Sequence, residues 1–167
     1  MKNLNFIIAM LISFLMFSAQ SFAEEGNVKL TNKAFKQVIK TNDKGEKVLD
    51  YIDPALALPG DVIFYTTTFE NIGKEPATKV VINNPIHGNL KYRQGSATGK
   101  DTEIKFSIDG GVSYDSPEKL FVTDKTGKKW AAKPEDYTAI RWIYKKQLLP
   151  GEKGTVSFRA IIRKPGE

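Results

Sequence analysis

The chain is 167 residues long and carries 25 Lys and Arg against 19 Asp and Glu, a formal charge of +6, with no cysteine. Its one histidine is His87, and its three methionines all fall within residues 1–16. This composition excludes disulfide bonds, thiol catalysis, cysteine-ligated zinc, iron–sulfur clusters and metal sites built from several histidines. A chain of this length has room for one domain, or for one domain behind a leader.

The N-terminal segment has the pattern of a secretory signal peptide. Lys2 precedes an apolar run at residues 6–17 that only Ser13 interrupts, and Ser21 and Ala23 place small residues at the positions that a signal peptidase reads. An uncleaved membrane anchor is the alternative, but a span needs about 20 apolar residues and this run is shorter. We therefore predict a signal peptide at residues 1–23. Residues 24–167 are then one exported domain, periplasmic or extracellular, with no membrane span.

The charges of the predicted mature chain are mixed along the sequence and not gathered in blocks. Removing Lys2 leaves 24 basic and 19 acidic residues, a formal charge of +5. A nucleic-acid-binding domain is expected to show a dense basic stripe. The nearest approach is the segment 125–130, where Thr126 and Gly127 are typical of a turn in a solvated loop. The sequence therefore predicts no nucleic-acid partner, and only weak, salt-sensitive attraction to anionic envelope surfaces.

Short runs rich in Val, Ile, Thr, Phe and Tyr, separated by Gly and Pro, predict an all-β protein. All 13 Gly and all 8 Pro lie after residue 23 and recur without clustering. Such punctuation is typical of a sandwich or barrel of antiparallel strands. The predicted strands are 28–39, 48–52, 61–69, 78–82, 103–108, 112–114, 120–123, 138–144 and 155–163. One antiparallel β-sandwich domain is the predicted fold.

Three segments carry more specific predictions. Residues 61–69 are apolar or β-branched on both sides, which favours a central strand covered on both faces. Residues 109–111, with the sequence Asp-Gly-Gly, predict a hairpin turn that leads into a strand at 112–114. Pro followed by Glu-Asp predicts one or two helical turns at 134–137.

A series of turn-and-strand motifs runs through the domain. They are Leu-Pro-Gly-Asp at 58–61 before a strand with Tyr65, Asn-Ile-Gly at 71–73, a Val-rich strand ending at Asn84-Pro85, Ser-Ile-Asp-Gly-Gly at 107–111 and Leu-Pro-Gly at 149–151. Together they resemble the bacterial conserved repeat domain family, also called domain of unknown function eleven, over about residues 59–163. The resemblance implies an immunoglobulin-like sandwich in an exported envelope or surface protein. This chain departs from the family in its single copy and its extra segment at about 109–135. The family has no catalytic residues to carry over.

The chemistry-bearing residues form no recognised catalytic motif. His87 lies between Asn84-Pro85-Ile86 and Gly88, which is typical of a loop, and no serine stands in a Gly-x-Ser-x-Gly elbow. Calcium takes oxygen ligands, and Asp109, Asp115 and Asp124 fall in loops around one hairpin, but the spacing of a calcium-binding loop is absent. We therefore predict no enzyme activity, no cofactor and no metal. A hydrolase built from carboxylates that are distant in sequence stays open as an alternative.

Two aromatic residues are the candidate contact residues for a ligand or partner. Trp130 follows two lysines in a polar stretch, where it would stack on a sugar or a partner's side chain, or cap the end of the sandwich. Tyr114 closes the segment 112–114. Trp142 lies in an alternating strand and is predicted to belong to the core.

Two functions are compatible with this pattern. The first is a non-enzymatic module of the bacterial cell envelope that binds another envelope protein through exposed strand edges and end loops. The alternative is a carbohydrate- or small-ligand-binding module that uses Trp130 and Tyr114.

Overall fold

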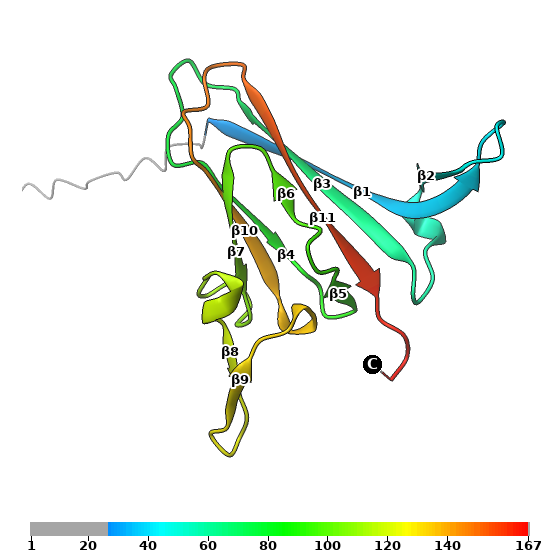
Figure 1. The fold of residues 1–167 in the computed structure, drawn as a ribbon. Helices are drawn as coiled ribbons and strands as arrows, with labels where there is room; N and C mark the ends of the chain where they lie inside the picture. Colours follow the sequence, from blue (N-terminus) through cyan, green and yellow to red (C-terminus); the bar gives the residue numbers. More distant parts are fainter. Residues whose placement is uncertain (1–26, 167) are drawn as a thin grey trace, which may run out of the picture.

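The computed structural model describes residues 27–166, so the predicted signal peptide lies outside the described residues. This part of the chain folds into antiparallel sheets, which confirms the predicted all-β class (Figure 1). Its strands are β1 (Val28–Thr41), β2 (Lys47–Ile52), β3 (Val62–Asn71), β4 (Val81–Pro85), β5 (Leu90–Tyr92), β6 (Thr98–Gly99), β7 (Thr102–Ser107), β8 (Phe121–Thr123), β9 (Lys129–Ala131), β10 (Ala139–Tyr144) and β11 (Lys153–Ile162). Between residues 27 and 166, no helix is both long enough and apolar enough to cross a membrane.

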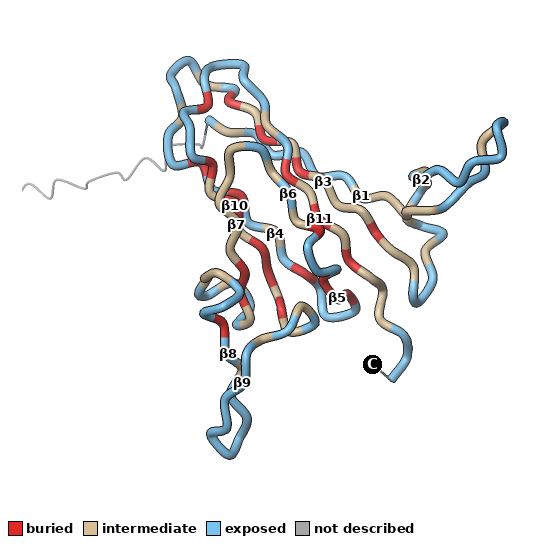
Figure 2. Tube along the Cα trace, in the orientation of Figure 1, coloured by how far each residue is buried: buried red, intermediate tan, exposed pale blue. Residues whose placement is uncertain are grey.

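The strands form two layers. The large sheet has the order β2-β1-β3-β11-β5, and β6 pairs with another part of β11. The small sheet has the order β4-β10-β7, while β8 and β9 form a separate hairpin. The large and small sheets face each other across one apolar core, which gives a sandwich-like arrangement (Figures 1 and 2).

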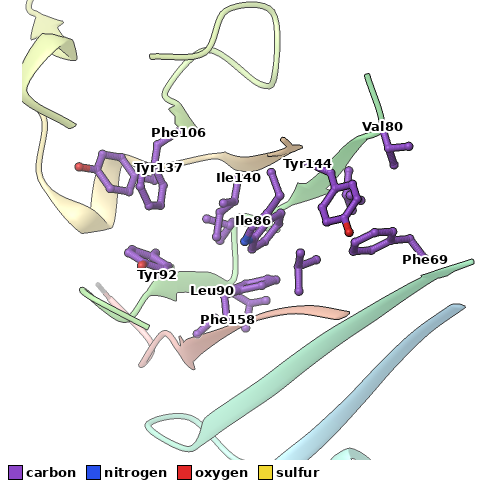
Figure 3. Close-up of a cluster of buried hydrophobic side chains, with 14 of the residues drawn as sticks. Phe69, Val80, Ile86, Leu90, Tyr92, Phe106, Tyr137, Ile140, Tyr144 and Phe158 are labelled. Atoms are coloured by element: carbon purple, nitrogen blue, oxygen red, sulfur yellow. The ribbon is translucent and has the colours of Figure 1, made fainter. Parts of the chain in front are cut away.

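Aromatic rings make up much of the core between the sheets (Figure 3). The ring of Phe69 on the large sheet lies 5.3 Å from that of Tyr144 on the small sheet. Trp142 is fully buried, as predicted, with its ring 6.1 Å from Phe158 and its Nε1 donating to the carbonyl of Thr98 at 3.1 Å. Burying one large apolar side chain contributes about 1.5–3 kcal/mol, so such a cluster can hold the layers together without cross-links.

The corner after β3 is closed by Asn71, which is fully buried. Its Oδ1 accepts the N–H of Gly73 at 2.9 Å, a contact by which asparagine side chains commonly close their own turn. Its Nδ2 donates to the carbonyls of Glu75 and Leu148, both at 2.8 Å. The second of these bonds ties the corner to a segment far along the chain. The next predicted corner is also confirmed, because β4 ends at Pro85.

The predicted strand at 112–114 is wrong. The carboxylate of Asp109 accepts the N–H of Ser113 at 3.0 Å and also its hydroxyl proton, which curls the chain into a loop. The loop pairs with the backbone of β7 at one isolated bridge, between Phe106 and Asp115, and the Ser107 hydroxyl of β7 also accepts the N–H of Gly111. The side chain of Asp109 thus supplies the acceptor that a neighbouring strand would otherwise supply.

Other strand limits also differ from the prediction. β4 begins later than expected, because Lys79 takes a left-handed φ of 55° and interrupts the extended backbone. β5 and β6 have three and two residues, too few for an alternating pattern to be visible. β9 lies partly in a segment that was expected to be a loop. The helical turns predicted at 134–137 are one 3-10 turn, Pro134–Asp136.

Strand β3 is central, as predicted, because it lies between β1 and β11. Its inward side chains, such as Ile63 and Phe69, are buried against the core. Its outward side chains, such as Phe64 and Thr66, remain half-exposed. The prediction that both faces are covered is therefore wrong: the small sheet covers the inner face, and the outer face belongs to the molecular surface.

Strand β1 is 14 residues long and continues past β3. Its first part pairs with β3, and its residues 36–41 pair with β2. These residues and β2 form a two-stranded ribbon, the distal ribbon, which extends away from the small sheet (Figure 1). Asn42 holds the tip by accepting the N–H groups of Lys44 and Glu46 at 3.0 and 2.9 Å, and Gly45 supplies a positive φ of 79°. Figure 2 shows that the ribbon consists of exposed and half-buried residues.

Candidate binding surface

The outer face of the large sheet carries a row of aromatic rings where the distal ribbon joins the sheet. The ring of Tyr51 lies 6.3 Å from that of Phe35 and 5.1 Å from that of Phe64. The guanidinium of Arg159 lies 4.9 Å from the centre of the Phe64 ring. Arg159 also donates from Nε to the Gln37 side-chain oxygen at 2.8 Å and from Nη2 to the Tyr51 hydroxyl at 3.3 Å. These contacts hold the positive charge of Arg159 in one place at the surface.

A groove of about 440 Å³ lies beside this row. It is lined by Gln37, Ile39, Leu49, Arg93, Gln94, Gly95, Ser96 and Arg159. Ile39 and Leu49 face each other across the distal ribbon and are 68% and 54% exposed. Removing apolar surface from water is favourable by about 25 cal/mol per Å², so this pair is a source of binding free energy that the fold itself does not use.

The free edge of β2 is less available than its face. The carboxylate of Asp50 accepts the N–H of Tyr51 at 2.8 Å and forms an ion pair with Lys40 on the neighbouring strand. The bond from Lys40, followed by that from the Tyr51 amide, lowers the pKa of Asp50 and keeps its carboxyl group ionised. An N–H that already has an acceptor cannot pair with an added strand. At Tyr51 the edge therefore offers no free N–H to an added strand, whereas the side chains on the flat side of the distal ribbon remain exposed.

Two further hollows adjoin the groove at the loop after β5. One, of about 440 Å³, shares Arg93 and Gln94 with the groove. The other, of about 560 Å³, shares Gln94 and Gly95 with it. This loop is therefore the point at which three adjoining depressions of the surface meet.

The larger hollow has an aromatic lining. Tyr92, Phe106 and Tyr137 all contribute to it, and the rings of Phe106 and Tyr137 stack with their centres 4.5 Å apart. Burial raises the pKa of the Tyr137 hydroxyl above its ordinary value, so this group stays protonated and can donate a hydrogen bond. Gln94 and Glu118 add polar atoms to the lining. An apolar wall with a few polar groups is the usual composition of a small-ligand pocket.

The outer face of the large sheet is strongly basic, although the chain as a whole is mixed. The strand register places six cationic side chains on it: Lys29, Lys33, Lys47, Lys91, Lys153 and Arg159. The acidic side chain that points outward from these strands is Glu70, and its Oε1 lies 3.2 Å from Nζ of Lys153. We call this set, together with Arg93 in the groove lining, the basic face.

The other side of β1 has a different charge arrangement. Lys36 lies 2.7 Å from Asp61, and Lys40 forms an ion pair with Asp50. The lysines that point to that side therefore have acidic partners within the fold. On the basic face, Lys153 pairs with Glu70, whereas Lys33, Lys47 and Arg93 form no ion pair between residues 27 and 166.

The two aromatic residues singled out in the sequence lie at separate places. Tyr114 packs against the small sheet, where the guanidinium of Arg141 lies 3.8 Å from the centre of its ring. Trp130 lies in β9 opposite Val122 and is 38% exposed. Neither residue lines the groove or the two hollows beside it. The sequence motifs thus did not indicate the groove, whose aliphatic pair comes from an alternation that also fits an ordinary strand.

The aspartates considered for calcium each serve their own loop. The carboxylate of Asp109 holds its loop through Ser113, Asp124 accepts the N–H and hydroxyl of Thr126, and Asp115 pairs with a nearby lysine. Within residues 27–166, no group of three or more His, Cys, Asp or Glu side chains is placed to hold a metal ion. These carboxylates are explained by the local fold.

No protein-family model matches this chain, and no curated protein matches it either. The resemblance to the conserved repeat domain family therefore stays a prediction from turn motifs, and the geometry of the surface is the basis for a function.

Proposed function

We propose that the protein is an immunoglobulin-like, non-enzymatic module of the bacterial cell envelope that acts by binding another protein in the groove beside the distal ribbon. One observation carries the proposal: Ile39 and Leu49 lie side by side and largely exposed, next to an arginine that is already fixed in position. Exposed aliphatic side chains grouped in a depression mark contact sites more often than single exposed residues do.

The composition of the groove supports a protein partner. Contact sites between proteins are enriched in Tyr and Arg, and their affinity comes from a few anchors in well-packed depressions. Arg159 and Tyr51 are both held by partners within the fold, so little side-chain entropy is lost when a partner covers them. The location in the envelope and the immunoglobulin-like family rest on the leader at residues 1–23 and on the turn motifs.

A photo-crosslinking amino acid placed at Leu49 in cells that produce the protein tests this function. The matched control is the same amino acid at Val81, which is 43% exposed but lies in the small sheet. We expect a discrete adduct with one protein from the Leu49 position and none from Val81. Adducts from neither position, or equal patterns from both, would contradict the proposed contact site.

The aromatic hollow favours a second candidate, the binding of a carbohydrate or small ligand. Its volume of about 560 Å³ and its aromatic lining are the supporting observations. The test adds a panel of glycans to the protein and follows the NMR chemical shifts of the backbone amides of Gln94 and Tyr137. Shifts confined to the hollow would support this function, and shifts confined to Trp130 and Tyr114 would support the site predicted from the sequence.

A further inference from the structure

We propose that the partner segment bound in the groove is acidic and carries an apolar side chain. In this arrangement its carboxylates lie along the basic face, and the apolar side chain enters the groove beside Ile39 and Leu49. The inference rests on the proposed function, because it names the chemistry of the partner at that same site.

Charge complementarity is the first argument. Lys33, Lys47 and Arg93 are exposed and form no ion pair within residues 27–166. They extend from β1 and β2 to the loop after β5, so one face of the sheet has an excess of a single sign. Such a face attracts an oppositely charged surface before contact and sets its orientation.

The aliphatic pair decides in favour of a protein segment over a polysaccharide or a nucleic acid. Ile39 and Leu49 offer no hydrogen-bonding atom, and they stabilise a bound apolar side chain, which an anionic sugar polymer lacks. A single-stranded nucleic acid needs open aromatic faces for its bases. The rings at this site pack on one another and beneath Arg159, so they do not form such a platform.

The tip of the distal ribbon argues against a membrane surface. Asp43 and Glu46 are exposed at the tip, and Glu46 is also held by the side chain of Asn42. Lys44 and Lys47 stand beside these carboxylates, so the tip has no net positive charge with which to attract the anionic headgroups of a bilayer interface. The aliphatic pair lies on the flat side of the ribbon, where a peptide segment can reach it.

The test measures binding of the purified exported protein to a random copolymer of glutamate and tyrosine, with polyglutamate, polygalacturonate and phosphatidylglycerol vesicles as competing ligands. The test variant is Lys33→Gln/Lys47→Gln/Arg93→Gln. The matched control, with the same change of charge on exposed residues elsewhere, is Lys74→Gln/Lys125→Gln/Lys128→Gln. We expect the test variant to bind the copolymer about ten-fold more weakly, from three surface charge contacts, and the control to change less than about two-fold.

Further measurements test the role of Ile39 and Leu49 and the chemical class of the bound partner. Ile39→Ser/Leu49→Ser is expected to abolish the preference for the copolymer over polyglutamate while leaving polyglutamate binding unchanged. Equal losses in both triple variants would overturn the inference, and so would tighter binding to polygalacturonate or vesicles than to the copolymer. An adduct at Leu49 that the test variant does not weaken would overturn the inference but leave the proposed function standing. Absence of any adduct at Leu49 would overturn the function itself.

Discussion

Replacement of Asn71 is expected to be strongly destabilising, because this side chain is fully buried and all its hydrogen-bonding groups have partners. Asn71→Ala removes the side-chain donor from the carbonyls of Glu75 and Leu148 and the acceptor from the N–H of Gly73. The Leu148 carbonyl keeps the N–H of Ala77 as a donor. A buried polar group without a partner costs about 1–3 kcal/mol. Allowing for partial access of water to the corner, we expect a loss of about 3–5 kcal/mol in the free energy of unfolding. That is a large share of the total stability of a domain this size, which is about 5–15 kcal/mol.

Asn71→Asp gives a sharper test, because the aspartate keeps the oxygen that accepts a hydrogen bond and replaces the NH₂ group that donates two. An ionised carboxylate would face the carbonyl oxygens of Glu75 and Leu148, so the fold would raise the pKa of this carboxyl above its ordinary value of about 4. The folded state then binds more protons than the unfolded state, and stability falls as the pH rises. We expect this variant to be at least as unstable as Asn71→Ala at pH 7, and to recover part of the loss as the pH approaches 4.

Urea unfolding, followed by far-UV circular dichroism and by tryptophan fluorescence, gives both free energies. The matched control is Asn42→Ala, which also removes an acceptor from two N–H groups, at the tip of the distal ribbon, where water replaces it. We expect the control to lose less than about 1 kcal/mol. The reasoning is refuted if Asn71→Ala costs no more than the control, or if Asn71→Asp becomes more stable as the pH rises.

Three other predictions concern packing and pH. A Cβ on Gly154 would lie 2.1 Å from Cζ of Phe69, so the ring would have to move. Gly154→Ala should therefore lower the free energy of unfolding, measured by urea titration, by about 1–3 kcal/mol. An unchanged free energy of unfolding would contradict the position of the Phe69 ring. Trp142→Phe should lower the free energy of unfolding by about 2–3 kcal/mol, because it removes a hydrogen bond and leaves a cavity. Trp130→Phe, at a partly exposed position, should lower it by less than about 0.5 kcal/mol. Equal losses in the two variants would contradict the burial of Trp142. Hydrogen bonds from two serine hydroxyls lower the pKa of Asp109, so its contribution to stability is present above about pH 4 and lost as the pH falls through the folded-state pKa. A carboxyl NMR titration should give a midpoint below 3.8, and a midpoint at or above that value would be the contrary result.

The corners of the fold could be predicted from the sequence because each depends on a local requirement. Asn71 bonds to its own turn two residues on, and Pro85 cannot donate to a strand ladder, so both limits follow from residue type. The prediction of a strand at 112–114 was wrong for a related reason. It follows residues that suit a hairpin, but the carboxylate of Asp109 satisfies the backbone there and removes the need for a neighbouring strand.

The candidate surface could not be predicted in the same way, because it depends on which strands become neighbours. Lys33 and Arg159 lie far apart along the chain and reach one face only because β1 and β11 both pair with β3. Alternation within β1 then separates Lys33 from Lys36 and sends Lys36 to the side where Asp61 neutralises it. A chain with mixed charges thus acquires one face with an excess of a single sign. The lack of a basic stripe in the sequence is therefore weak evidence against an anionic partner. The choice among anionic partners depends on the aliphatic pair in the groove, which favours a protein.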